Sequence, residues 1–119
     1  QYNGSQWVQI GQDIDGEASG DYSGRSVSLN SDGTIDAIGA RYNNNNGNGS
    51  YNSGHVRVYQ YNGSQWVQIG QDIDGEAIHD QSGWSVSINS DGTIVAIGAP
   101  YNDGGGSNSG HVRVYQLTN

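Results

Sequence analysis

The sequence contains no cysteine, so neither a disulfide bond nor a thiolate metal site is possible. It also lacks lysine: its four basic residues are arginines, set against 12 acidic residues, and the formal net charge is −8. Nucleic acids and anionic membrane surfaces bind basic proteins, so this charge argues against both as partners. No apolar run approaches the ~20 residues of a membrane-spanning helix, and we expect no membrane insertion.

Large apolar side chains are scarce as well. Phenylalanine and methionine are absent, proline occurs once, and hydrophobic residues make up 32% of the chain. A chain with this composition and charge approaches that of disordered proteins. Against disorder stand eight tyrosines, three tryptophans and a near-perfect internal repeat, none of which a disordered linker needs.

The chain is a tandem repeat. Residues 1–18 recur letter for letter as residues 60–77, and residues 1–43 differ from residues 60–102 at only seven positions. The differing pairs are Ser19/Ile78, Gly20/His79, Tyr22/Gln81, Arg25/Trp84, Leu29/Ile88, Asp36/Val95 and Arg41/Pro100. We therefore divide the chain into two repeats, residues 1–59 and residues 60–119. Because the sequence begins inside a repeat, we interpret it as a segment of a larger assembly.

One stretch in each repeat has the pattern of a β-hairpin. In residues 26–40 and 85–99, Ser alternates with Val, Leu or Ile, an Asn-Ser-Asp-Gly turn follows, and a run rich in Ile and Ala leaves the turn. This pattern predicts two antiparallel strands joined by a tight turn. We expect Asn30 to pair with Gly33. The alternation puts small and apolar residues on one face, which suits close stacking against a neighbouring sheet.

The expected register places Val27 opposite Asp36 and makes Arg25 a diagonal neighbour of Asp36. The second repeat has Trp84 and Val95 at the positions of Arg25 and Asp36. We interpret this double change as the exchange of an ion pair for an apolar pair. Unrelated drift at two surface positions is the alternative.

Each repeat contains four candidate strands. The first covers residues 6–10 and 65–69, the hairpin arms supply the next two, and the last covers residues 55–60 and 111–116. Four short strands per repeat, with turn residues between them and no helical period, are typical of a propeller blade. We expect an all-β fold of two four-stranded antiparallel blades, frame-offset so that the N-terminal strand completes a blade of the same or another copy.

The second repeat resembles the FG-GAP repeat, the blade unit of integrin-α-like β-propellers, and the first repeat shares the resemblance. It rests on the segments Ser82–Ser87, Asp91–Pro100 and Ser109–Tyr115. Ser-Gly replaces the family's Phe-Gly, and Arg41 replaces the proline of Gly-Ala-Pro in the first repeat. The resemblance implies an extracellular or cell-surface scaffold or adhesion role, with calcium in the hairpin loop.

The hairpin loop offers few of the oxygens that calcium needs. The family's ligand positions fall on Ser28, Asn30, Asp32 and Asp36 in the first repeat, and the second repeat keeps only the carboxylate of Asp91. Ca²⁺ takes six or more oxygen ligands, several of them carboxylates. We therefore favour a plain turn over a calcium loop.

A second candidate calcium site is the segment Asp-Ile-Asp-Gly-Glu, which occurs in both repeats. Its carboxylates are Asp13, Asp15, Glu17, Asp72, Asp74 and Glu76. They either bind Ca²⁺ around the glycine or form a solvated acidic connection. Paired carboxylates also serve glycosidases, but an identical pair in both repeats fits a structural role. We expect no enzyme and no required cofactor, with calcium as the one candidate.

Two further groups are candidate ligand or modification sites. The aromatic residues Tyr2, Trp7, Tyr61 and Trp66 either stack on sugars or pack between blades. Asn3, Asn48 and Asn62 each begin an Asn-Gly-Ser glycosylation sequon. The three histidines lack metal-ligand spacing, and we interpret them as ordinary strand and loop residues.

Two blades cannot close a propeller, which has four to eight of them. They leave two open sheet faces and an unpaired edge, so we predict a homo-oligomer: a ring of three or four copies, or a head-to-tail filament. The predicted function is a non-enzymatic extracellular structural or adhesion module that self-assembles. The alternative is a lectin-like or calcium-dependent module that binds glycans.

Overall fold

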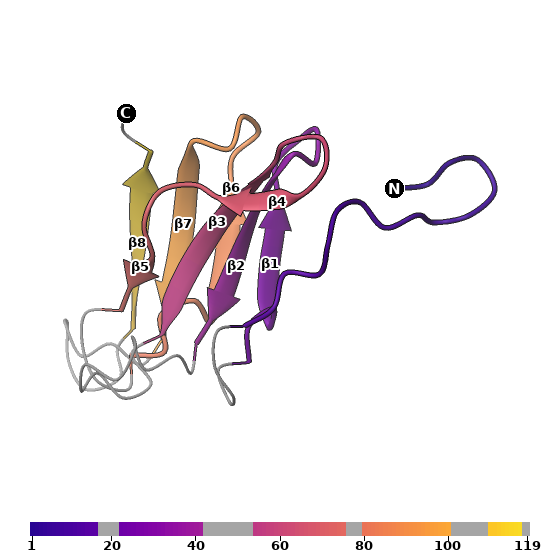
Figure 1. The fold of residues 1–119 in the computed structure, drawn as a ribbon. Helices are drawn as coiled ribbons and strands as arrows, with labels where there is room; N and C mark the ends of the chain where they lie inside the picture. The colour runs from indigo at the N-terminus through magenta and orange to yellow at the C-terminus, as the bar shows by residue number, and fades with distance from the viewer. Residues whose placement is uncertain (17–21, 42–53, 76–79, 101–109, 118–119) are drawn as a thin grey trace.

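The computed structural model describes residues 1–16, 22–41, 54–75, 80–100 and 110–117. These residues form eight β-strands (Figure 1), which confirms the predicted all-β antiparallel class. In these ranges no helix is long and apolar enough to cross a membrane. The predicted ligands Glu17 and Glu76 and the sequon residue Asn48 lie outside the described residues.

The first sheet, which we call blade 1, has four strand positions. Strands β1 (Ser26–Leu29), β2 (Ile35–Ala40) and β3 (His55–Tyr61) lie side by side in that order. The short strands β4 (Trp66–Gln68) and β5 (Ile73–Asp74) pair with opposite ends of β3. Together they fill the fourth position. It is interrupted near Gly70, whose φ of 73° is the left-handed conformation that favours glycine.

The second sheet, blade 2, has three strands instead of the predicted four. Its strands are β6 (Ser85–Ile88), β7 (Ile94–Ala99) and β8 (His111–Gln116). Their antiparallel registers repeat those of β1, β2 and β3. Among the described residues β8 pairs with β7 alone, so its other edge has no neighbouring strand.

The N-terminal segment, residues 1–16, does not form the strand expected at residues 6–10. Its one ladder contact is an isolated bridge between Tyr2 and Trp7. In Figure 1 this segment projects beyond β1, whereas β8 lies at the opposite side of the molecule. The strand is missing because residues 66–68 and 73–74 have β3 as a partner, while among the described residues no strand lies beside their counterparts 7–9 and 14–15.

The hairpin register differs from the predicted one by two residues. Val27 lies opposite Ile38, and Leu29 lies opposite Asp36. A shift of two residues preserves the face of every side chain, because side chains in a strand alternate with period two. The predicted sorting of residues between the two faces is therefore correct, although the predicted partners are wrong.

The side chain of Asn30 explains the longer turn. Its Oδ1 accepts hydrogen bonds from the backbone N–H groups of Thr34 and Ile35, both at 3.0 Å. The backbone N–H of Asn30 also donates to the carbonyl oxygen of Ile35 at 3.0 Å. This arrangement closes a four-residue loop, so Asn30 pairs with Ile35 and not with Gly33 as expected.

The two blades stack closely along their inner strands. Ser26 Oγ donates to the carbonyl oxygen of Gly83 at 2.7 Å, and the N–H of Ile88 donates to Ser28 Oγ at 3.1 Å. Gly39 lies so close that an added Cβ would collide with the Gly83 carbonyl. Small residues on the facing strands thus allow the sheets to approach.

A small apolar core fills the space between the blades. Its buried members are Ala37 and Val56 from blade 1 and Val95 and Ile97 from blade 2. Toward the outer strands the sheets diverge and leave an apolar-lined cavity of about 280 Å³ between β3 to β5 and β7 to β8.

Candidate functional site

The same residues are buried in blade 1 and exposed in blade 2. Val56 on β3 packs against blade 2 and is 0% exposed, whereas its counterpart Val112 on β8 is 69% exposed. Val58 is half-buried beside the core, whereas its counterpart Val114 is 66% exposed. The outer face of blade 2 therefore presents to solvent the surface that blade 1 uses for stacking.

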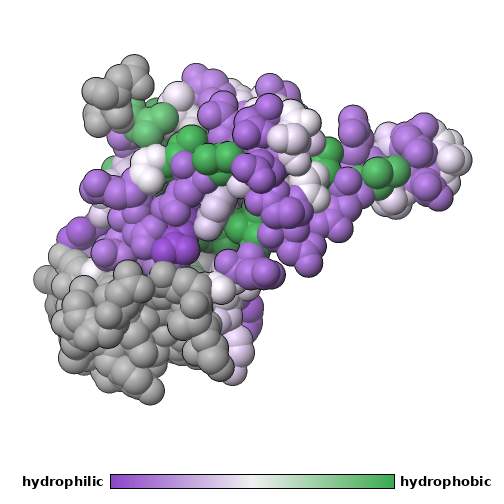
Figure 2. Space-filling view, viewed as in Figure 1, coloured by the Kyte–Doolittle hydropathy of each residue, from purple (hydrophilic) through white to green (hydrophobic). Residues whose placement is uncertain are grey.

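The outer face of blade 1 shows the reverse pattern. Val86 and Ile88 of blade 2 pack against the core between the blades. Their counterparts Val27 and Leu29 are 60% and 57% exposed. The two outer faces thus carry the two complementary halves of the interface that joins the blades inside the chain. Figure 2 shows that apolar residues elsewhere on the viewed face form only small patches among hydrophilic ones.

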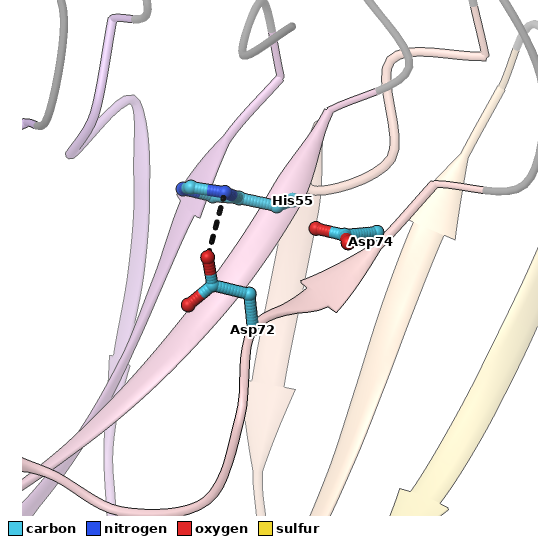
Figure 3. A group of neighbouring side chains, drawn as sticks. All are labelled: His55, Asp72 and Asp74. Atoms are coloured by element: carbon cyan, nitrogen blue, oxygen red, sulfur yellow. Dashed lines mark ion pairs between the residues drawn. The ribbon is translucent and has the colours of Figure 1, made fainter. Parts of the chain in front are cut away.

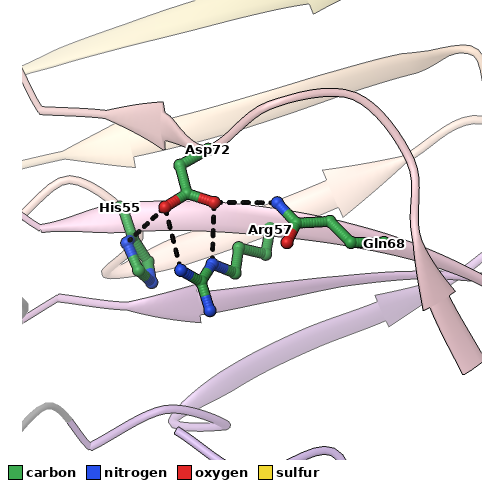
Figure 4. Close-up of polar contacts among 4 residues, drawn as sticks. All are labelled: His55, Arg57, Gln68 and Asp72. Atoms are coloured by element: carbon green, nitrogen blue, oxygen red, sulfur yellow. Dashed lines mark hydrogen bonds and ion pairs between the residues drawn. The ribbon is translucent and has the colours of Figure 1, made fainter. Parts of the chain in front are cut away.

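A polar network braces the outer part of blade 1 (Figure 4). Arg57 on β3 binds Asp72 with both ends of its guanidinium group, Nε to Oδ1 at 2.7 Å and Nη2 to Oδ2 at 3.0 Å. Gln68 Nε2 also donates to Asp72 Oδ1, at 2.7 Å. The hydrogen bonds from Arg57 hold the pKa of Asp72 below its usual value. The network therefore fixes the segment between β4 and β5 to β3.

The same carboxylate lies beside a histidine (Figure 3). His55 Nδ1 is 3.8 Å from Asp72 Oδ2, and potential ligand atoms of His55, Asp72 and Asp74 lie within 4.8 Å of one another. The guanidinium of Arg57 already occupies both oxygens of Asp72. A cation at this position would share both oxygens with the positively charged guanidinium, so the arrangement suits a structural brace better than a calcium site. Sequence spacing predicted Asp72 and Asp74 as neighbours but missed His55, because pairing of β3 with β5 brings it beside them.

The first-repeat copy of the acidic segment is more open. Asp13 and Asp15 are exposed, and Gln9 Nε2 donates to Asp13 Oδ1 at 2.8 Å. This bond repeats the one between Gln68 and Asp72. The structure therefore places the two acidic segments in different surroundings: Asp72 accepts from an arginine and a glutamine, and the exposed Asp13 accepts from a glutamine.

The carboxylates of the hairpin loops serve the turns. Asp32 Oδ1 accepts from Thr34 Oγ1 at 2.6 Å, and Asp91 Oδ1 accepts from Thr93 Oγ1 at 2.7 Å. These hydrogen bonds lower the pKa of both aspartates. Both carboxylates thus bond within their own turns, and the preference for a plain turn over a calcium loop stays a prediction.

The predicted ion pair between Arg25 and Asp36 is wrong. The register places Asp36 opposite Leu29 on β1, and one oxygen of its carboxylate is buried without a hydrogen-bond partner. Burial raises the pKa of Asp36 to about 6. Trp84, which replaces Arg25 in the second repeat, instead lies under the guanidinium of Arg41, 3.9 Å from its ring centroid. The substitution thus creates a cation–π contact between the blades.

The candidate sugar-stacking aromatics form two equivalent pairs. Tyr2 and Trp7 have ring centroids 5.3 Å apart, and Tyr61 and Trp66 have theirs 5.4 Å apart. Trp66 Nε1 donates to the carbonyl oxygen of Ile10 at 2.9 Å, so this ring packs against the N-terminal segment. Trp7 is 80% exposed. Trp66 therefore packs against the N-terminal segment, whereas its counterpart Trp7 is largely exposed.

The two described sequons form identical exposed turns. Oδ1 of Asn3 and of Asn62 accepts hydrogen bonds from the serine and the glutamine that follow in each turn. These bonds use the oxygen of the side-chain amide and not Nδ2, the atom to which a glycan would be attached. Glycosylation at these two sites stays a prediction.

Comparison with known proteins gives a family match within the second repeat. Among curated proteins, no sequence matches this chain. Residues 72–115, which include β5, β6, β7 and most of β8, match the model described as FG-GAP repeat. Such repeats suggest an integrin-like propeller module, are generally non-enzymatic and typically occur in extracellular or surface proteins. The match confirms the resemblance predicted from the sequence: residues 72–115 of this chain match an FG-GAP repeat.

Proposed function

We propose that the chain is a non-enzymatic extracellular structural or adhesion module that self-assembles head to tail. Blade 2 of one copy stacks against blade 1 of the next. The observation that carries this proposal is the exposure of Val112 and Val114, whose counterparts Val56 and Val58 pack against the neighbouring blade. The chain contains the interface once internally and presents its two separated halves at its two ends.

Burial of apolar side chains supplies the driving force. Val27 and Leu29 of one copy would lie on Val112 and Val114 of another, as Val86 and Ile88 lie beside Val56 inside the chain. Full burial of a side chain of this size is worth about 1.5–3 kcal/mol. Four such side chains favour association before the entropic cost of joining two molecules is subtracted.

Hydrogen bonds between the blades can also be repeated between copies. Inside the chain, Ser26 Oγ donates to the carbonyl oxygen of Gly83. The equivalent residues at the open ends are Ser85 of one copy and Gly24 of the next, and Ser85 is exposed in the single chain. The proposed interface would therefore form hydrogen bonds as well as bury apolar side chains.

The interface joins two different surfaces, so it is heterologous and propagates. Identical rotations close a ring if a whole number of them completes a turn, and otherwise they build a filament. Three or four copies would supply six or eight blades, within the range of known propellers. Electron microscopy of the purified chain should show rings or filaments. Isolated particles of single-chain size at micromolar concentration would contradict the proposal.

The alternative is a lectin-like or calcium-dependent binding module. Its support is the exposed pair of Tyr2 and Trp7 and the acidic segment at Asp13 and Asp15. A glycan array tests the first feature, and a thermal shift on addition of Ca²⁺ tests the second. Binding in either experiment by chains that remain single would favour the alternative over self-assembly.

A further inference from the structure

We propose that the N-terminal segment of one copy forms the missing outer strand of blade 2 in the neighbouring copy, and that Asp13 there receives the guanidinium of Arg113. This inference rests on the proposed self-assembly and adds a specific interlock to it. The stacking of blade faces would join the copies, and the exchanged strand would fix their register.

The acceptor is the outer edge of β8. In blade 1 the equivalent edge of β3 is covered by β4 and β5, whereas among the described residues β8 pairs only with β7. An uncovered edge presents unpaired backbone N–H and C=O groups, and an extended segment can add to it as a further strand. Blade 2 thus lacks the element that residues 66–74 supply to blade 1.

The donor has the sequence that this edge requires. Residues 1–18 are identical to residues 60–77, which contain β4 and β5. Transferring the observed pairs to blade 2 places Gln9 opposite Tyr115, because Gln68 lies opposite Tyr59. The same transfer places Ile14 opposite Val112. The register of the interlock is therefore fixed by a pairing that the chain already contains.

The charges of donor and acceptor are complementary. Arg57 holds Asp72 with two charge-assisted hydrogen bonds in blade 1, and the corresponding residues are Arg113 on β8 and Asp13 in the N-terminal segment. Gln9 already donates to Asp13 at 2.8 Å, as Gln68 does to Asp72 at 2.7 Å. One part of the brace is thus formed in the donor before any partner arrives.

The N-terminal segment is also positioned for a partner from another copy. Trp66 Nε1 donates to the carbonyl of Ile10, and Gln12 exchanges hydrogen bonds with the backbone of Trp66 at 2.9 and 3.0 Å. These contacts hold the segment against blade 1 of its own chain. Figure 1 shows it at the opposite side of the molecule from β8, so the chain's own edge is out of its reach in this arrangement.

A designed disulfide tests the interlock directly. The chain has no cysteine, so the double variant Gln9→Cys, Tyr115→Cys contains only the intended pair. Cross-strand partners have the Cα separation that a disulfide requires. We expect mild oxidation to convert the full chain into a ladder of covalent dimers, trimers and larger species on a non-reducing gel. The matched control Gln9→Cys, His111→Cys moves one cysteine about 13 Å along the same face of β8, away from the stacking residues Val112 and Val114, and should give no ladder.

Three other results would overturn the interlock. A disulfide confined to single chains would mean that the segment pairs with its own β8. Assemblies detected by sedimentation without a covalent ladder would mean that copies stack through their faces alone, which leaves the proposed function standing. Single chains without cross-links would contradict both proposals.

Exchanging the charges tests the predicted contact between Asp13 and Arg113. In the disulfide background, Asp13→Arg or Arg113→Asp alone should slow formation of the ladder roughly tenfold, because a charge-assisted hydrogen bond is replaced by like charges. The double exchange should restore most of the rate. A double variant as slow as the single variants would show that these two residues do not meet.

Discussion

Blade 1 and blade 2 have nearly the same sequence and different surroundings. Val56 and Val112 occupy the same strand position with the same neighbours in sequence, yet one is fully buried and the other is 69% exposed. The difference arises from what lies beside each sheet, since blade 1 has blade 2 on this side and blade 2 has nothing described on it. A repeated sequence thus encodes an interface whose second half must come from outside the chain.

A second difference between the blades lies at the outer strand. Arg57 has Asp72 as its partner, and the edge of β3 is covered. In the part of the chain that the structure describes, no strand pairs with the equivalent edge of β8, and the matching aspartate, Asp13, lies in the segment that projects from the other side of the molecule. Blade 1 therefore shows the arrangement that we expect for blade 2 in the assembly, with a strand on its outer edge and an aspartate bound to its arginine.

The largest expected effect comes from aspartate at the two equivalent valines. Val56→Asp puts an unpaired charge into the core between the blades and should cost more than about 4 kcal/mol, enough to unfold the chain. Val112→Asp changes an exposed residue, so the single chain should keep its β-sheet spectrum and lose assembly. Circular dichroism and sedimentation measure the two properties. Similar unfolding of both variants would contradict the difference in burial.

Alanine at the two equivalent glycines should separate stability from assembly more finely. Gly39→Ala forces a methyl group against the Gly83 carbonyl and should destabilise the chain by about 1–3 kcal/mol. At Gly98 the nearest atom to an added Cβ is Ser85 Oγ, which can rotate away. Gly98→Ala should therefore leave chemical denaturation unchanged and weaken association. Equal loss of stability in both variants would contradict the model of one filled and one open face.

Removal of the two equivalent arginines compares the braced edge with the open edge. Arg57→Ala leaves Asp72 without its main partner and should cost about 2 kcal/mol. Because the pKa of Asp72 is lowered in the folded chain, this stabilisation is present above pH ~4 and is lost as the pH falls through the lowered pKa. Arg113 is exposed and donates to Tyr115 Oη at 3.4 Å, so Arg113→Ala should cost dilute single chains less than Arg57→Ala does. Denaturation curves from pH 2 to pH 7 check both statements, and a pH-independent loss in Arg57→Ala would contradict the assignment.

The smallest expected effect concerns Asp36, whose counterpart in blade 2 is the buried Val95. Burial raises the pKa of Asp36 from 3.8 to about 6, so its charged form destabilises the fold above pH 6 and the penalty disappears below pH 4. Asp36→Val should stabilise the chain at pH 7.5 by about 1–2 kcal/mol, a value reduced for the partial exposure of the carboxylate. The gain should vanish at pH 4. The control Asp32→Asn removes a carboxylate with a lowered pKa and should have the opposite sign at pH 7.5.

The sequence predicted the faces of the strands better than their partners. Alternation between Ser26 and Leu29 sorts side chains onto two faces, and a two-residue shift does not disturb that sorting. The register depended on the side chain of Asn30, which closes the four-residue loop through hydrogen bonds that residue type alone does not specify. Alternation along a strand therefore predicts which face a side chain takes, whereas the turn determines which residues lie opposite one another.

The candidate site was predictable only where it depends on repetition. Because two blades cannot close a propeller, the sequence predicted open sheet faces. It could not show which of the equivalent residues Val56 and Val112 is buried, because their sequence surroundings are the same. The pairing of Arg57 with Asp72 spans 15 residues and depends on the return of the chain between β4 and β5. The contact between Arg41 and Trp84 joins two positions where the repeats differ, and stacking of the blades brings them together.

The central claim is that the interface between blades inside the chain is also the interface between copies. Sedimentation velocity of the unmodified chain and of Val112→Asp, at matched concentrations from 1 to about 100 µM, tests it most directly. We predict that the unmodified chain sediments as assemblies whose size increases with concentration or stops at a ring, while the variant sediments as a folded single chain. A folded single chain for both proteins over the whole range would contradict the claim.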